Sequence, residues 1–173
     1  MQHTLFTTAF GTCGISWGDE GITGFQLPGE SDALTEGRMA AKGVSTPCDQ
    51  APEWVQGIVA RVRLHLEGAP QDFSEARLDW ALVSDFRRAV YAQTQRVAPG
   101  FRTSYGDISR ALGLGPEGAR AVGAALASNP WPLLVPCHRV VAADGRMTGF
   151  SAPGGVRTKT RLLALEGAEL LSE

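Results

Sequence analysis

The sequence predicts an α+β fold in which a small sheet-bearing unit precedes a mostly helical unit. Residues 4–27 alternate apolar with small polar residues, which is the period of a half-buried strand. From Pro52 onward, apolar residues recur at helical spacing in several segments that Gly- or Pro-rich stretches separate. The stretch GAPQDFSE at 68–75 is typical of a linker, so we divide the chain into domains at 1–78 and 79–173.

The first domain is expected to hold two or three antiparallel strands. They fall within residues 4–27, where GDEG at 18–21 marks a tight turn. Residues 28–52 are rich in Gly, Ser and Pro, and we expect a long loop there with one helical turn at most. A helix is predicted from Pro52 to about Glu67, because apolar residues recur there at helical intervals. They are Trp54, Val55, Ile58, Val59, Val62 and Leu66.

The second domain is expected to open with a helix over residues 83–97, which Pro99–Gly100 ends. Ser104 stands three residues before Asp107, a spacing that resembles a capping box. We therefore predict a short helix that begins after Ser104 and runs through Leu112.

A second short helix is predicted to follow the glycine turn at 113–115. Pro116 suits the first turn of a helix, and Asn129–Pro130 would stop it after about Ser128. Two short helices joined by such a turn form the helix-turn-helix pattern. By itself the pattern does not establish DNA binding, because many short helix pairs make no contact with DNA.

The composition is that of an ordinary folded chain. Apolar residues make up 43% of the sequence and charged residues 20%, a balance that excludes intrinsic disorder. No stretch approaches the roughly 20 consecutive apolar residues of a membrane helix, and the N-terminus lacks the pattern of a secretory signal. The three cysteines are widely spaced without a CxxC pair, so we expect no disulfide framework and a reducing, cytoplasmic setting.

The charge is unevenly distributed along the chain. The formal net charge is -2, but residues 1–99 carry 8 basic against 12 acidic residues, whereas residues 100–161 carry 8 basic against 3 acidic ones. A basic face toward phosphates and an ordinary solvated surface are both compatible with this distribution. The eight basic residues are Arg102, Arg110, Arg120, Arg139, Arg146, Arg157, Lys159 and Arg161.

The segment NPWPLLVPCHRVVAADG at 129–145 holds the candidate nucleophile. Its apolar run at 133–135 is expected to be a buried strand that delivers Cys137 and His138 just beyond a proline. Two interpretations of Cys137 stand side by side: a buried thiol that packs as a small hydrophobe, or a nucleophile activated by the adjacent base. Cys13 and Cys48 have no such neighbours, and we expect both to serve packing alone.

At this point the sequence resembles the methylated-DNA–protein-cysteine methyltransferase family, the O6-alkylguanine-DNA alkyltransferases. The resemblance covers roughly residues 83–170 and is looser in the strand pattern at 4–27. The motifs that carry it, in family order, are TSYGDIS (103–109), ARAVGAALASNP (119–130), PCHRVV (136–141), GRMTGFSAPGG (145–155) and TKTRLLALEG (158–167). It implies a ribonuclease-H-like first domain and a second domain with a helix-turn-helix and the active site.

The resemblance implies irreversible transfer of an alkyl group from O6 of guanine in DNA to Cys137. His138 would be the base, acting through a water molecule, and Glu166 would orient its ring. Asn129 would brace the network, and Tyr105 would donate a proton or hydrogen bond to the departing base. Without the resemblance, Glu166 would be taken for a surface residue near a helix end, Tyr105 for a core aromatic and Asn129 for a helix stop.

The implied partner is double-stranded DNA that contains O6-alkylguanine. A stacked base cannot present its alkyl group to a buried thiol, so the nucleotide must be flipped out. Arg120 matches the family arginine that takes the place of the base, although a phosphate contact is its simpler role. Small residues on this helix imply close docking in the minor groove with little sequence specificity. The DNA-binding set is Ser104, Ala119, Arg120, Gly123 and Ala124.

The base pocket implied by the resemblance consists of Pro132, Val135, Val140, Phe150 and Ser151. Phe150 stands where some members have tyrosine, and Ala152–Pro153 lengthens the loop relative to some relatives. Some members bind zinc in the first domain, but the candidate ligands here do not fall at the matching places, so we expect no metal and no cofactor. They are His3, Cys13, Cys48 and His65. A monomer is expected.

Two other functions compete with alkyl transfer. An alkyltransferase-like lesion-binding protein flips the damaged base without reacting, but such proteins lack the cysteine that Cys137 supplies here. A Cys–His hydrolase would turn over repeatedly, whereas a self-alkylating protein reacts once, because the thioether on Cys137 has no route of removal.

Overall fold

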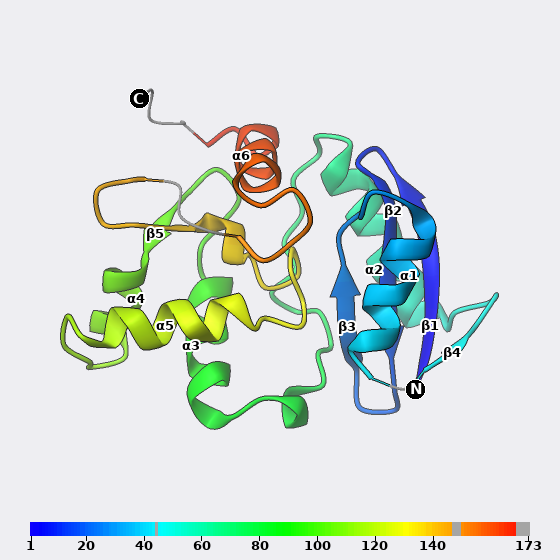
Figure 1. Cartoon of the computed structure of the whole chain (residues 1–173), viewed down its shortest axis with the longest axis horizontal. Helices are drawn as coiled ribbons and strands as arrows, with labels where there is room; N and C mark the ends of the chain where they lie inside the picture. The colour runs from blue at the N-terminus through cyan, green and yellow to red at the C-terminus, as the bar shows by residue number, and fades with distance from the viewer. Residues whose placement is uncertain (44, 147–149, 169–173) are drawn as a thin grey trace.

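The computed structural model describes residues 1–43, 45–146 and 150–168, and these form an α+β fold. A four-stranded sheet with helices α1 and α2 lies at one end, and helices α3, α4 and α5 gather at the other (Figure 1). Helix α6 lies across the top of both groups. None of the helices in the described ranges is long and apolar enough to span a membrane.

The sheet is built on three antiparallel strands, where two or three were predicted. They are β1 (Gln2–Thr8), β2 (Gly11–Trp17) and β3 (Ile22–Gln26), in the order β3-β2-β1-β4. The fourth strand, β4 (Thr46–Pro47), pairs in parallel with β1, which was not predicted because two residues show no periodicity. The ribonuclease-H-like detail stays a prediction.

The loop expected over 28–52 is wrong in part, because it contains the ten-residue helix α1 (Asp32–Ala41). The Ser31 hydroxyl caps this helix by accepting from the Leu34 amide at 3.2 Å. Helix α1 packs against β2 and β3 with Met39, which is 1% exposed, while Leu34 faces solvent. A helix that buries so few apolar side chains shows little periodicity in its sequence.

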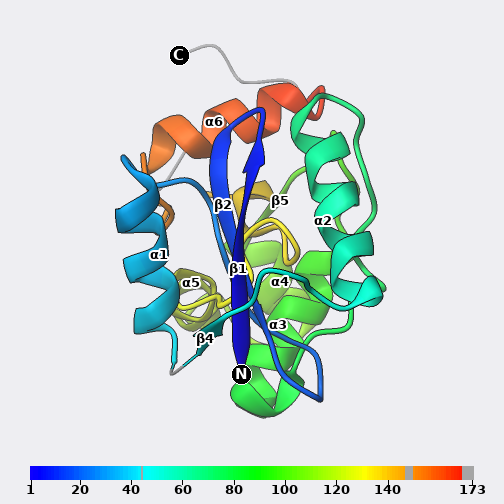
Figure 2. The same ribbon diagram turned by 90° about the vertical axis from the view of Figure 1, so that its right-hand side faces the viewer.

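The helix predicted from Pro52 is confirmed as α2 (Glu53–Leu66). It buries Val55, Ile58, Val59, Val62 and Leu66, and His65 is buried with them. Figure 2 shows α1 and α2 to either side of the strands. The apolar stripe of α2 thus closes the core of the first half, and it carries one polar side chain inward.

The helices of the second half are confirmed close to their predicted bounds. After the short 3₁₀ turn η1 (Trp80–Leu82) come α3 (Asp85–Gln95), α4 (Tyr105–Ala111) and α5 (Gly118–Ala127). The Ser104 hydroxyl caps α4 by accepting from the Asp107 amide at 3.0 Å, as the spacing predicted. Helix α6 (Val156–Leu165) completes the chain that the structure describes.

The buried strand predicted at 133–135 is wrong: the segment is buried but turns back on itself. Leu133 has a positive φ of 77°, and the Val135 amide donates to the Trp131 carbonyl at 2.8 Å. Prolines before and after the segment cannot donate to a ladder, which prevents a strand here. Cys137 opens a 3₁₀ turn, η2 (Cys137–Arg139), and β6 (Val140–Val141) pairs in parallel with β5 (Thr103–Ser104).

Trp131 joins the two halves of the core. It is 0% exposed, and its indole Nε1 donates to the Ile22 carbonyl of β3 at 2.8 Å. Its ring lies edge-on to Trp80 and Tyr91, with centroids 5.3 and 6.1 Å away. The Phe25 amide donates to the Pro130 carbonyl at 2.9 Å, so the edge of the sheet holds the loop that leads to Cys137.

Replacing Trp131 by phenylalanine should destabilise the protein by about 1–3 kcal/mol, because the Ile22 carbonyl loses its buried donor. Chemical denaturation followed by circular dichroism measures this loss. Trp54→Phe is the matched control, since Trp54 is only half-buried beneath Arg77. Equal losses in the two variants would show that the link from Trp131 to the sheet contributes nothing.

Candidate active site

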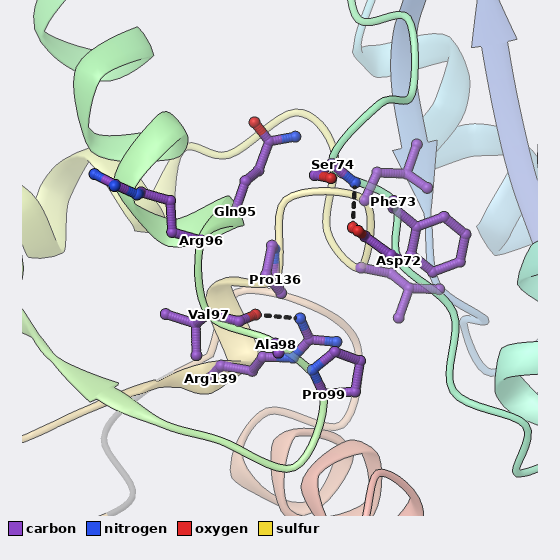
Figure 3. A pocket seen from close by; sticks show the side chains of 12 residues that line it. Asp72, Phe73, Ser74, Gln95, Arg96, Val97, Ala98, Pro99, Pro136 and Arg139 are labelled. Atoms are coloured by element: carbon purple, nitrogen blue, oxygen red, sulfur yellow. Dashed lines mark hydrogen bonds between the residues drawn. The ribbon is translucent and has the colours of Figure 1, made fainter.

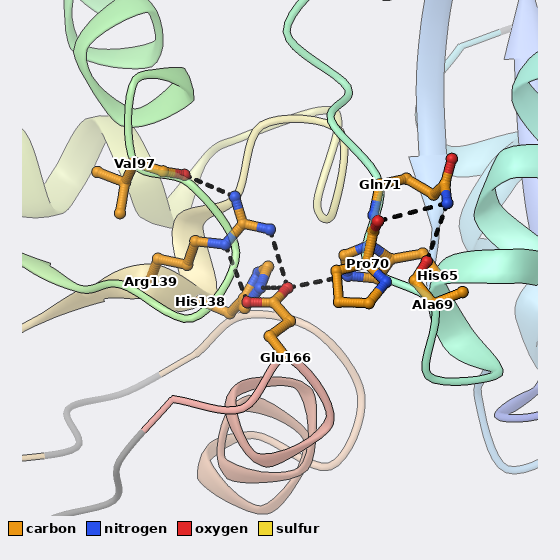
Figure 4. A network of polar contacts seen from close by, with 8 residues as sticks. All are labelled: His65, Ala69, Pro70, Gln71, Val97, His138, Arg139 and Glu166. Atoms are coloured by element: carbon orange, nitrogen blue, oxygen red, sulfur yellow. Dashed lines mark hydrogen bonds and ion pairs between the residues drawn. The ribbon is translucent and has the colours of Figure 1, made fainter.

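One buried carboxylate accepts hydrogen bonds from the polar side chains near Cys137. Glu166 follows the last turn of α6, and its Oε1 lies 2.7 Å from Nε2 of His138 and 2.9 Å from Nε2 of His65 (Figure 4). The Arg139 guanidinium donates to both carboxylate oxygens at 2.9 Å and to the Val97 carbonyl at 2.7 Å. The histidine and glutamate side chains are fully buried.

This arrangement keeps Glu166 ionised. Burial by itself raises the pKa of the carboxyl group, but hydrogen bonds from His138, His65 and Arg139 outweigh it and hold the pKa well below its usual range. Burial lowers the pKa of His138, and the hydrogen bond to Glu166 opposes that shift in part. His138 is therefore neutral, and a carboxylate partner requires its proton to be on Nε2.

The other ring nitrogen of His138 is then a free base. Nδ1 is buried and has no hydrogen-bond partner among the described residues. A buried acceptor of this kind is normally satisfied, commonly by an ordered water molecule. Nδ1 is the nitrogen that would take a proton from the Cys137 thiol, and it is free to accept one.

Cys137 lines a cavity of about 340 Å³. Its side chain is 5% exposed, and burial raises the pKa of the thiol. Hydrogen bonding by Asn129 and the positive charges of Lys159 and Lys42 oppose this rise. The other lining residues are Tyr105, Gly123, Leu126, Ala127, Phe150 and Ser151.

Asn129 fixes the turn that precedes the nucleophile. Its Nδ2 donates to the Val135 carbonyl at 3.0 Å, and its Oδ1 accepts from the Trp131 amide at 2.9 Å. It therefore ends α5 and braces the segment before Cys137 at the same time. Burial also raises the pKa of Cys13, to about 12, and this thiol lies in the hydrophobic core.

The side chains predicted to meet DNA lie on the two short helices beside this cavity. Arg120 and Ala124 of α5 are exposed, and Ala119 and Gly123 are half-buried. A Cβ added to Gly123 would lie 3.8 Å from the Tyr105 ring, at ordinary van der Waals distance, so this part of α5 lies directly beside the first residue of α4. The Ser104 hydroxyl, in contrast, is engaged as the cap of α4.

The predicted base pocket is brought together in part. Phe150 and Ser151 line the cavity with Cys137, whereas Pro132 lines an adjoining cavity of about 450 Å³ that shares Ser151. Val135 and Val140 are fully buried in the core, and the Val140 carbonyl accepts from Lys159 Nζ at 2.6 Å. Part of the GRMTGF segment, residues 147–149, lies outside the described residues.

Three polar residues of the site were not predicted: His65, Arg139 and Lys159. Arg139 and Lys159 were counted toward a basic face, but they are 4% and 1% exposed and belong to the interior. Their positions carried a signal, since Arg139 adjoins His138 and Lys159 precedes Glu166 by about two helical turns. His65 stands on the apolar stripe of α2, where a polar residue indicates a buried partner.

A further cavity of about 150 Å³ lies beside Arg139, between the linker and the end of α3 (Figure 3). Asp72 faces this space and accepts from the Ser74 amide at 2.8 Å. Cys137 does not line it, so we assign it no part in the chemistry.

The fold and the site define a DNA-binding protein with a buried cysteine–histidine–glutamate centre. Residues 85–168 match the family model described as 6-O-methylguanine DNA methyltransferase, DNA binding domain. The chain belongs to the methylated-DNA–protein-cysteine methyltransferase family. Its relative of that name in Methanothermobacter thermautotrophicus is 32% identical over 91% of this chain and 80% of its own length.

Other similar proteins are named for DNA base flipping or for methyl transfer from O6-methylguanine. A protein of Thermus thermophilus named DNA base-flipping protein is 42% identical over 69% of this chain and 80% of its own. The O6-methylguanine methyltransferase of Mycobacterium tuberculosis superposes with a TM-score of 0.78 at 28% identity, over 96% of this chain and 92% of that one. Mycobacterium tuberculosis OGT in complex with DNA gives a TM-score of 0.78 at 28% identity, covering 96% and 93% of the two chains.

Proposed function

We propose that this protein repairs DNA by transferring an alkyl group from O6 of guanine to Sγ of Cys137, once per molecule. The observation that carries the proposal is the buried thiol that lines a cavity, next to a neutral histidine whose Nδ1 is open. The Glu166 carboxylate behind that histidine stabilises the imidazolium that forms when the thiol is deprotonated.

The reaction begins with removal of the thiol proton. A water molecule at Nδ1 of His138 relays the proton from Cys137 to the imidazole, and Glu166 holds the ring by its Nε2–H. Because burial raises the pKa of Cys137, the thiolate is a minor species in the free protein, and Asn129 and Lys159 stabilise it. A buried thiolate with few solvating partners is a strong nucleophile.

Transfer then breaks one bond and forms another. The thiolate attacks the alkyl carbon in line with the bond to O6, the S–C bond forms, and the electron pair of the C–O bond stays on guanine. Tyr105, at the mouth of the cavity, donates a hydrogen bond or proton to the departing base. Guanine thereby gains a proton, and the imidazolium of His138 and any tyrosinate at Tyr105 return to their neutral forms by proton exchange with solvent. The thioether on Cys137 is permanent.

DNA is bound through α4 and α5 in the minor groove, with little sequence specificity. The face of α5 is built from Ala119, Gly123 and Ala124, which offer no side chains to read base edges. The damaged nucleotide swings into the cavity, Phe150 and Ser151 contact the base, and Arg120 fills the gap left in the duplex. The protein acts as a monomer.

We further propose that residues 1–78 and 79–173 form two domains joined through Trp131 and Glu166. The three cysteines are free thiols, which fits a protein of the reducing cytoplasm.

Replacing Arg120 by alanine should slow transfer from duplex DNA by about tenfold or more, because unstacking a base costs a few kcal/mol that the arginine helps to offset. Transfer from a single-stranded oligonucleotide with the same lesion should change little. Rapid-quench assays on both substrates measure the ratio, with Arg96→Ala as an exposed control. Equal slowing on both substrates would contradict the flipping role of Arg120.

The decisive test of the proposed function is stoichiometry. A labelled O6-methylguanine duplex in excess should leave one label per protein molecule and then no further reaction. A hydrolase would turn over, and a lesion-binding protein would retain the duplex without taking the label. Either result would overturn alkyl transfer.

A further inference from the structure

We infer that His65, a residue of α2 in the first half of the chain, is a positioning residue for alkyl transfer that holds the Glu166 carboxylate against His138. The inference rests on the proposed function and deepens it, because it gives the first half a part in the chemistry beyond packing. The bond between His65 and Glu166 joins residues 101 positions apart in the sequence.

The hydrogen bonds of His65 define which nitrogen carries its proton. The Gln71 backbone amide donates to Nδ1 at 2.9 Å, so Nδ1 has to be an acceptor. Nε2 therefore carries the hydrogen and donates it to Oε1 of Glu166 at 2.9 Å. The ring is 0% exposed and packs on Phe73, with centroids 5.4 Å apart, so it is held in this orientation.

Glu166 depends on such partners for its position. It is the residue that ends α6, directly before Gly167, which has a φ of 78°. Its Oε1 accepts from His65, from His138 and from Arg139 (Figure 4). Arg139 approaches from one side and His65 from the opposite side, so loss of His65 leaves the carboxylate free to move away from His138.

The charges around His65 give it an electrostatic effect as well. Three ionisable groups face it: Glu166 from α6, and His138 and Arg139 from η2. Burial is the main cause that lowers the pKa of His138, and the hydrogen bond and charge of Glu166 oppose this lowering. By holding the carboxylate in place, His65 preserves that support for the imidazolium that forms when His138 takes the thiol proton.

The test is His65→Leu, which keeps an apolar group of similar reach and removes the donor. We expect single-turnover methyl transfer to slow about tenfold at its pH plateau, as is usual when a partner behind a reacting group is lost. The acidic limb of the pH–rate profile should move to lower pH, because a displaced carboxylate no longer stabilises protonated His138. The dissociation constant for the duplex should not change, since His65 lies far inside the protein.

Two variants distinguish positioning from a loss of stability. His65→Gln retains a donor near the position of Nε2 and should recover the rate to within about threefold of wild type. His3→Leu removes another buried histidine that faces a glutamate, at 3.4 Å, in the sheet, and should leave the rate and the pH profile unchanged.

The inference is overturned if folded His65→Leu protein transfers methyl at the wild-type rate with the wild-type pH profile. It is also overturned if the rate falls only in proportion to the unfolded fraction while the profile stays in place. A wild-type protein that takes no methyl group would instead overturn the proposed function itself.

Discussion

Replacing Cys137 by alanine is expected to abolish methyl transfer completely while the protein continues to bind damaged duplex DNA. Among the described lining residues, Cys137 carries the strongest nucleophile, and the hydroxyls of Tyr105 and Ser151 attack carbon far less readily, so no other side chain is expected to substitute for it. The surface proposed to meet DNA, on α4 and α5, does not include Cys137 and is left intact. Removing one buried sulfur should cost little stability, because alanine fits the same space.

The measurement pairs a label-transfer assay with a binding assay on the same oligonucleotide. Cys48→Ser is the matched control: this thiol is half-buried near the surface, and its loss should leave one label per molecule. Residual transfer by Cys137→Ala protein would place the acceptor elsewhere. If Cys137→Ala protein lost DNA binding as well as transfer, Cys137 would be part of the DNA-binding surface. That result would contradict the prediction that the variant still binds DNA.

Replacing Glu166 by glutamine is expected to lower both the stability of the protein and the rate of transfer. The amide has one acceptor oxygen where the carboxylate serves three side chains, so Arg139 is left as a buried charge without its counterion. Breaking a buried pair in this way costs about 3–5 kcal/mol. His138 loses the group that fixes its tautomer, and we expect transfer to fall by roughly 100-fold or more.

The stability loss should depend on pH in a defined direction. The pKa of Glu166 in the folded protein is well below its usual value, so its stabilising effect is fully present above about pH 4.3 and declines as the pH falls below that. The difference in unfolding free energy between wild type and Glu166→Gln should therefore shrink in acid. Glu67→Gln, an exposed change at the end of α2, should show no such difference. A loss that is independent of pH would contradict the assignment of a buried, ionised carboxylate.

The sequence predicted the elements whose side chains repeat with a clear period. Strands within 4–27 and the helix after Pro52 follow from alternation and from an apolar stripe, and the start of α4 follows from the cap at Ser104. Helix α1 was not predicted because it buries few apolar side chains. The turn at Leu133 was not predicted because an apolar run does not distinguish a strand from a buried turn.

The site was predictable only where neighbouring residues or the family motif carried it. Cys137 and His138 are adjacent in the chain, and Glu166 followed from the resemblance. His65 could not be found in that way, because its partner lies 101 residues away and the two residues meet only in the folded chain. The inward-facing position of His65 on α2 was the one local signal, and it indicates burial without naming the partner.

The most direct test of the central claim is mass spectrometry of the peptide that contains Cys137 after incubation with an O6-methylguanine duplex. We expect a single added methyl group on that sulfur, in proportion to the lesion consumed, with Cys13 and Cys48 unmodified. An unmodified Cys137 in a folded protein that has bound the damaged DNA would contradict the account.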